Sequence, residues 1–227
     1  MSQVCVSASR EDSRINPFPR IGIALLVLIL LVILPFFLSN GMRAFYLSEG
    51  GPIQVFSAAG YLVVAATLIH EFTYEQLRER WYFVLIPIAM CFREMDFHAH
   101  FTTMSITKIK FYLSGDVPLI EKLFGVSVFV VLGVAFVLMI HRHGKAFIRG
   151  LRSLDATAVA IFAAAMSVVL SKTLDGAVNK LAAFGYAGSS SLDLLTTVPE
   201  EVLELGIPVF LAIAAFSYSS NRRSPRQ

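Results

Sequence analysis

The stretch from Cys91 to Phe101, CFREMDFHAHF, carries five ionisable side chains directly after an apolar run, WYFVLIPIAM. They are Arg93, Glu94, Asp96, His98 and His100. Carboxylates and imidazoles bind zinc or transfer protons, and an arginine pairs with carboxylates or phosphates. These residue types raise the question of an active site, although the zinc-protease motif H-E-x-x-H is absent from the sequence.

The composition places this stretch in a membrane protein. Hydrophobic residues make up 56% of the 227 residues, charged residues make up 15%, and the mean hydropathy is +0.69. Soluble domains are about a quarter charged. The apolar residues form runs close to the ~20 residues that a helix needs to cross a bilayer. The sequence therefore predicts an all-α, polytopic membrane protein.

Six transmembrane helices are predicted, in a single integral membrane domain that covers residues 1–227. They lie at about 21–39, 52–70, 80–98, 118–140, 154–175 and 201–218. The first apolar run exceeds the ~7–15 residues of a signal-peptide core and is not followed by a small-residue cleavage site, so we expect it to be retained. Residues 1–20 and 219–227 are predicted to be polar tails on the cytoplasmic side.

The basic residues predict the orientation of the chain. Twelve of the 19 lysines and arginines fall on the side of the two termini: Arg10, Arg14, Arg20, Arg78, Arg80, Arg142, Lys145, Arg149, Arg152, Arg222, Arg223 and Arg226. Cytoplasmic segments carry the excess of lysine and arginine. We therefore expect an inner-membrane protein with both termini in the cytoplasm, and the CFREMDFHAHF stretch towards the outer face.

The helical rise indicates how deep the charges lie. At ~1.5 Å per residue, Arg93 lies ~20 Å above Arg80, inside a hydrocarbon core that is ~30 Å thick. By the same arithmetic Glu204 lies ~21 Å above Tyr218, and Lys172 lies ~26 Å above Asp155. Three predicted helices thus bring charges to a similar level in the outer leaflet.

Charges at this depth face the interior of a helix bundle and pair with one another, because exposure to lipid is costly. Spacings of three or four residues put Arg93 with Asp96, and Lys172 with Asp175, on shared helix faces. The expected ion pairs are Arg93 with Glu204 or Asp96, and Lys172 with Asp175. The whole predicted cluster comprises Arg93, Glu94, Asp96, His98, His100, Lys172, Asp175, Glu201 and Glu204.

Three interpretations of this cluster stay open, and the sequence favours structural ion pairs that fix helix packing. The first alternative is a membrane-embedded, metal-dependent hydrolase with an outward-facing site and a divalent metal as cofactor. Its catalytic candidates are Asp96, His98, Glu201 and Glu204, and its metal-ligand candidates are Asp96, His98, His100 and Glu204. The second alternative is a small transporter or proton-coupled carrier, although the inner halves of the fifth and sixth spans carry little polarity.

The expected partner is the lipid bilayer itself. A net charge of +3 is small and follows the predicted topology, so nucleic-acid binding is not expected. Cys5 and Cys91 do not form a disulfide framework or a C-x-x-C metal pair. A protein partner or a homo-oligomer is left open by the sequence.

Overall fold

The computed structural model describes residues 18–48, 50–97, 101–177 and 190–223. Within these ranges every regular element is a helix, and no strand is formed. The helices are α1 (Phe18–Ile33), η1 (Leu34–Phe37), α2 (Asn40–Tyr46), α3 (Pro52–Glu71), α4 (Tyr74–Glu79), α5 (Tyr82–Glu94), α6 (Ile109–Leu113), α7 (Leu119–Arg152), α8 (Ala156–Leu174) and α10 (Ser190–Arg223). The predicted all-α class is confirmed.

Five helical segments of the described chain are long and apolar enough to cross a membrane. They are Phe18–Phe37, Pro52–Glu71, Leu119–Arg152, Ala156–Leu174 and Leu194–Ser220. This supports the predicted membrane helix bundle. The predicted count of six is not confirmed, because the third predicted span, 80–98, contains only the 13-residue helix α5.

Helix α5 ends earlier than the sequence indicates. From Tyr82 to Glu94 it rises ~18 Å, well short of the ~30 Å hydrocarbon core. Asp96 then takes a left-handed backbone conformation with φ of 46°, which does not continue a right-handed helix. The prediction that Arg93 and Asp96 share a helix face is therefore wrong, since Asp96 lies in the turn after the helix.

Helices α7 and α10 extend beyond the predicted spans. The basic segment after residue 140 continues α7 to Arg152, because it contains no proline to interrupt the helix. Helix α10 starts at Ser190 instead of 201 and runs through Pro199 and Pro208 to Arg223. Each proline removes one backbone donor, but packing against neighbouring helices maintains the helix.

The centre of the bundle lies around α10, which packs against α8, α3 and α1. Small residues on α8, Ala160 and Ala164, let it approach closely. Gly206 of α10 serves the same purpose, since a Cβ there would be 3.2 Å from Leu28 and 3.3 Å from the Ser167 hydroxyl. Close helix contacts at these small residues thus complement the larger side chains of the core, such as Leu28 and Phe210.

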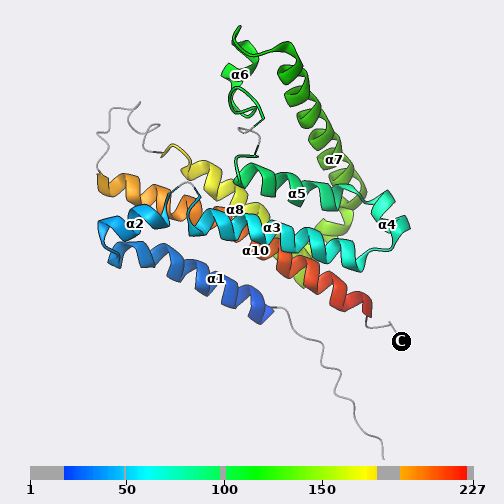
Figure 1. The fold of residues 1–227 in the computed structure, drawn as a ribbon. Coiled ribbons are helices and arrows are strands. Elements are labelled where there is room, and N and C mark those ends of the chain that lie inside the picture. Colours follow the sequence, from blue (N-terminus) through cyan, green and yellow to red (C-terminus); the bar gives the residue numbers. More distant parts are fainter. Residues whose placement is uncertain (1–17, 49, 98–100, 178–189, 224–227) are drawn as a thin grey trace, which may run out of the picture.

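Helix α7 diverges from the other long helices, as Figure 1 shows. Its C-terminal end meets α8 at a tight corner, where a Cβ on Gly150 would lie 2.9 Å from Ala158. At its other end, Phe111 and Tyr112 of the α6 segment pack on Gly125. Helix α7 thus packs against α8 at one end and against α6 at the other, and it stands apart from α5 along part of its length, which leaves room for the groove described below.

Candidate functional site

A single carboxylate oxygen joins three helices. Glu204 Oε1, on α10, accepts from Arg93 of α5 at 3.0 Å and forms an ion pair with Lys172 Nζ of α8 at 2.9 Å. The Ser171 hydroxyl of α8 donates to the same oxygen at 3.2 Å. These donors are distant from Glu204 in sequence, so the arrangement depends on the helices being packed together. We call Arg93, Ser171, Lys172 and Glu204 the ion-pair cluster.

The cluster is shielded on the acidic side and open on the basic side. Relative exposure is 15% for the Glu204 side chain, 36% for Arg93 and 47% for Lys172. A buried carboxylate needs paired cations and hydrogen bonds to offset the loss of its hydration. Glu204 has these partners, while both of its cations still reach open space.

Glu94 is a second carboxylate within ion-pair distance of Arg93. Its side chain is only 6% exposed, and its Oε1 lies 3.6 Å from the Arg93 guanidinium. The backbone carbonyl of Glu94 accepts a hydrogen bond from the side-chain amide of Gln54 on α3, which itself accepts from Gly50. This contact satisfies a terminal carbonyl of α5 and ties the end of that helix to the start of α3.

The other predicted members of the cluster lie farther out or outside the described residues. Asp175 forms an exposed pair with Lys172 at 3.4 Å. Asp96 is exposed in the turn after α5, and Glu201 is half-buried one turn before Glu204. His98 and His100 lie outside the described part of the chain, so the structure does not place them.

The metal hypothesis relied on those two histidines. Among the described residues, no group of three or more histidines, cysteines, aspartates and glutamates is arranged to hold a metal ion. Glu204, the remaining buried ligand candidate, is instead engaged by two cations and a hydroxyl. In the described part of the chain, the chemistry of Glu204 is that of ion pairing.

Three residues of this region escaped the sequence analysis. Ser171 is fully buried. The sequence feature that could have pointed to it is a hydroxyl side chain next to Lys172 within an apolar span. Gln54 was visible only as a lone amide in the apolar start of α3. Thr107, from the segment before α6, borders the cavity next to Arg93. Their roles depend on contacts between elements, which residue spacing along one helix does not reveal.

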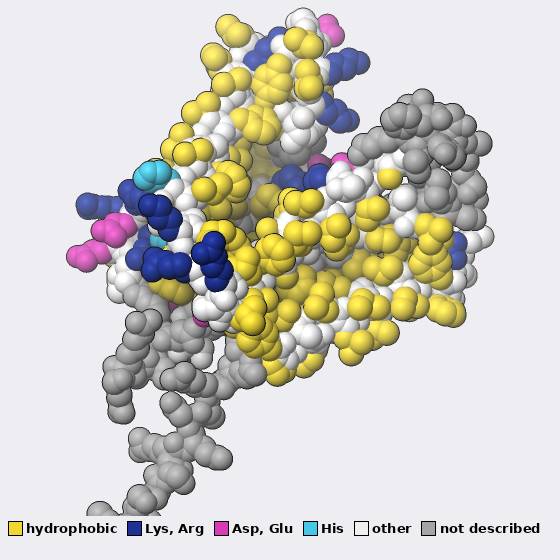
Figure 2. All heavy atoms as spheres, turned by 180° about the vertical axis from the view of Figure 1, so that it is seen from behind, with side chains coloured by type: hydrophobic (Ala, Val, Ile, Leu, Met, Phe, Trp, Pro, Cys, Tyr) yellow, Lys and Arg dark blue, Asp and Glu magenta, His cyan; other side chains and the backbone are white. Residues whose placement is uncertain are grey.

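A cavity of about 450 Å³ opens beside the ion-pair cluster. Figure 2 shows basic and acidic side chains in the hollow between the diverging helix α7 and the rest of the protein. The lining residues carry two cations and three carboxylates: Gln54, Arg93, Glu94, Asp96, Thr107, Lys172 and Glu204. The cavity can therefore meet charges of both signs on a ligand.

No protein-family model, curated protein or solved structure matches this chain. The arrangement of Arg93, Lys172 and Glu204 can fix three helices, and it can present two cations to a ligand. Each of these possibilities leads to a separate experiment.

Proposed function

We propose that this is a multi-pass inner-membrane protein whose charged cluster holds the outer halves of its helices together through ion pairs. The single observation that carries the proposal is the convergence of Arg93, Lys172 and Ser171 on Glu204 Oε1. Lipid offers no partner to a charge, so each charged group must find one within the protein. Three helices that meet at one carboxylate have a fixed mutual register.

The orientation belongs to the same proposal: both termini cytoplasmic, with 1–20 and 219–227 as cytoplasmic tails of one domain, 1–227. Contacts between the segments that carry the basic residues support this orientation. Arg142 of α7 donates to the backbone carbonyl of Glu79 at 3.0 Å, and Arg80 donates to the Tyr218 hydroxyl near the end of α10 at 3.2 Å. Three basic segments thus gather at one end of the molecule, as the positive-inside rule expects.

Glu204→Gln tests the ion-pair function directly. The substitution keeps the size of the side chain and removes the charge that compensates Arg93 and Lys172. Breaking a fully buried pair costs about 3–5 kcal/mol, and we expect about 1–3 kcal/mol here because both cations reach the open cavity. The measurement is the melting temperature of the detergent-purified protein, which should fall.

Asp175→Asn is the matched control, since among the described residues it removes the second carboxylate within ion-pair distance of Lys172. That pair is exposed, so its contribution should stay below about 1 kcal/mol. A melting temperature that falls equally in both variants, or in neither, would contradict the assignment of Glu204 as the central acid.

A further inference from the structure

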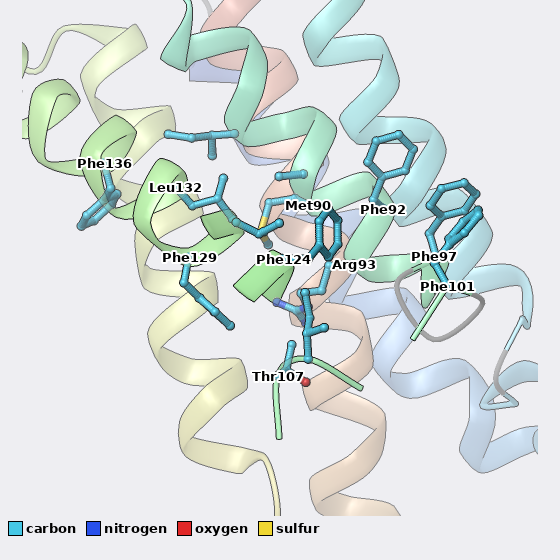
Figure 3. A pocket seen from close by; sticks show the side chains of 14 residues that line it. Met90, Phe92, Arg93, Phe97, Phe101, Thr107, Phe124, Phe129, Leu132 and Phe136 are labelled. Atoms are coloured by element: carbon cyan, nitrogen blue, oxygen red, sulfur yellow. The ribbon is translucent and has the colours of Figure 1, made fainter. Parts of the chain in front are cut away.

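An apolar groove runs between α5 and α7 and has a volume of about 520 Å³. Figure 3 shows its lining, in which Met90 of α5 faces Phe129 and Leu132 of α7, with Phe97 and Phe101 farther along. Ligand pockets in proteins commonly measure ~300–1,000 Å³ and are mostly apolar, so this groove is large enough for part of a lipid.

The groove leads directly to the charged cavity. Arg93 and Thr107 line both spaces, and they lie close together in Figure 3. Lys172 borders only the cavity, and it shares Glu204 Oε1 as an ion-pair partner with Arg93. The apolar groove and the charged cavity therefore adjoin at Arg93, and the cavity presents a second partly exposed cation, Lys172.

We propose that this combined site binds one membrane phospholipid with a zwitterionic, phosphoethanolamine-type headgroup. An acyl chain occupies the groove between α5 and α7, and the phosphate lies against Arg93 and Lys172. Arginine and lysine are the usual partners of phosphate oxygens in proteins. The exposed carboxylate of Asp96, in the lining of the same cavity, suits the ammonium group of such a headgroup.

The charges that line the cavity favour a zwitterionic headgroup over an anionic one. A purely anionic lipid would meet Arg93 and Lys172 favourably, but it would also face Asp96 and the paired acids Glu94 and Glu204. A headgroup that carries both signs avoids this repulsion. The proposal therefore selects phosphatidylethanolamine chemistry over phosphatidylglycerol chemistry.

The depth of Arg93 separates this site from the lipids that surround any membrane protein. In the proposed orientation Tyr82 lies at the cytoplasmic interface, and Arg93 lies ~17 Å further along α5, whereas the hydrocarbon core is ~30 Å thick. A phosphate at this level lies below the outer headgroup layer, and only fixed cations stabilise it there. The bound lipid should consequently resist removal by detergent.

The test measures phospholipid retained by the full-length protein after extensive detergent washing, with native mass spectrometry and phosphate analysis as readouts. Wild-type protein should retain one phospholipid, enriched in phosphatidylethanolamine over phosphatidylglycerol when both are supplied in equal amounts. Lys172→Gln removes a charge-assisted contact to the phosphate and should weaken retention roughly tenfold. Leu132→Trp fills the groove and should abolish retention without touching a charge.

Two control variants separate the site from general effects. Val131→Trp introduces the same residue at an exposed position of α7 that does not line the groove, and Lys110→Gln removes an exposed cation of α6. Both should retain lipid as the wild type does. Equal retention by all variants, no retention by the wild type, or a preference for phosphatidylglycerol would overturn the proposal.

The inference uses the cations of the proposed ion-pair cluster, but the two proposals can fail separately. Glu204→Gln reports through the melting temperature, whereas Leu132→Trp reports through lipid retention and leaves every ion pair intact. Loss of lipid in Leu132→Trp with an unchanged melting temperature in Glu204→Gln would support the lipid site and contradict the structural role. Lipid retention by Leu132→Trp, together with a lower melting temperature in Glu204→Gln, would support the structural role and contradict the lipid site.

Discussion

Gly60 of α3 and Pro208 of α10 touch so closely that a Cβ added to Gly60 would lie 2.9 Å from the Pro208 Cβ. Helix interfaces in membranes are enriched in small residues because these allow helix backbones to come together. Here the contact brings the proline ring of one helix onto the bare backbone of another, four residues after Glu204. The position of Glu204 relative to α3 thus depends on a glycine.

We therefore expect Gly60→Ala to destabilise the protein by about 1–3 kcal/mol, because the neighbouring helix must shift to admit the methyl group. Gly133→Ala on α7 is the matched control, since a Cβ there meets nothing within 4 Å. Thermal unfolding in detergent measures both variants. A Gly60→Ala protein as stable as Gly133→Ala would show that the interface is looser than the structure indicates.

Two fully buried tyrosines should respond differently to loss of their hydroxyl groups. Tyr82 shares a hydrogen bond of 2.9 Å with His143 Nε2, whereas the Tyr61 hydroxyl has no hydrogen-bond partner among the described residues. Tyr82→Phe should cost about 1 kcal/mol, while Tyr61→Phe should be neutral or stabilising because it removes an unsatisfied buried group. Melting temperatures of the two variants, measured side by side, test this order.

The Tyr61→Phe variant also tests whether the Tyr61 hydroxyl has a bound partner. Tyr61 lies within electrostatic reach of Glu94, Arg93 and Glu204. If Tyr61→Phe destabilises the protein as much as Tyr82→Phe, then the hydroxyl has a bound water or ion as a partner. That outcome would contradict the interpretation of Tyr61 as an unsatisfied buried group.

The proposed orientation predicts that a reporter fused after Gln227 is active on the cytoplasmic side. The reason is the gathering of Arg80, Arg142 and the end of α10 at one end of the molecule. A pair of reporters, one active only in the cytoplasm and one active only outside, measures this. The same pair inserted after Ser114, beside α6, should give the opposite result, and an identical result at both positions would refute the orientation.

Apolar runs and helical rise predicted the membrane class and a similar depth for Arg93, Lys172 and Glu204. They did so because both depend on local properties of single helices. The sequence paired Lys172 with Asp175, three residues away; the structure adds a shorter contact to Glu204 on another helix, at 2.9 Å against 3.4 Å. The expected pair of Arg93 with Glu204, also between helices, is present at 3.0 Å. The pair of Lys172 with Glu204 was missed because it depends on helix rotation and tilt, which residue spacing does not encode.

Helix ends were predicted poorly for a related reason. Hydropathy indicates where a segment leaves the apolar region of the membrane. It predicted that the span in α7 ends near residue 140 and that the span in α10 begins near residue 201. Both helices continue into polar sequence, since basic and acidic residues are compatible with a helix. At the end of α5, the backbone carbonyl of Glu94 accepts a hydrogen bond from the side-chain amide of Gln54 on α3, and the local sequence around Glu94 does not reveal this contact.

The corner between Gly150 and Ala158 has a mechanical consequence for the groove. Because Gly150 and Ala158 are in close contact there, a change in the angle between α7 and α8 would turn α7 about this corner as its pivot. Leu119, 31 residues away, lies ~47 Å from this pivot, so a small change of angle there becomes a large displacement at the far end. The width of the space between α5 and α7 is accordingly set by an angle at the opposite end of the helix.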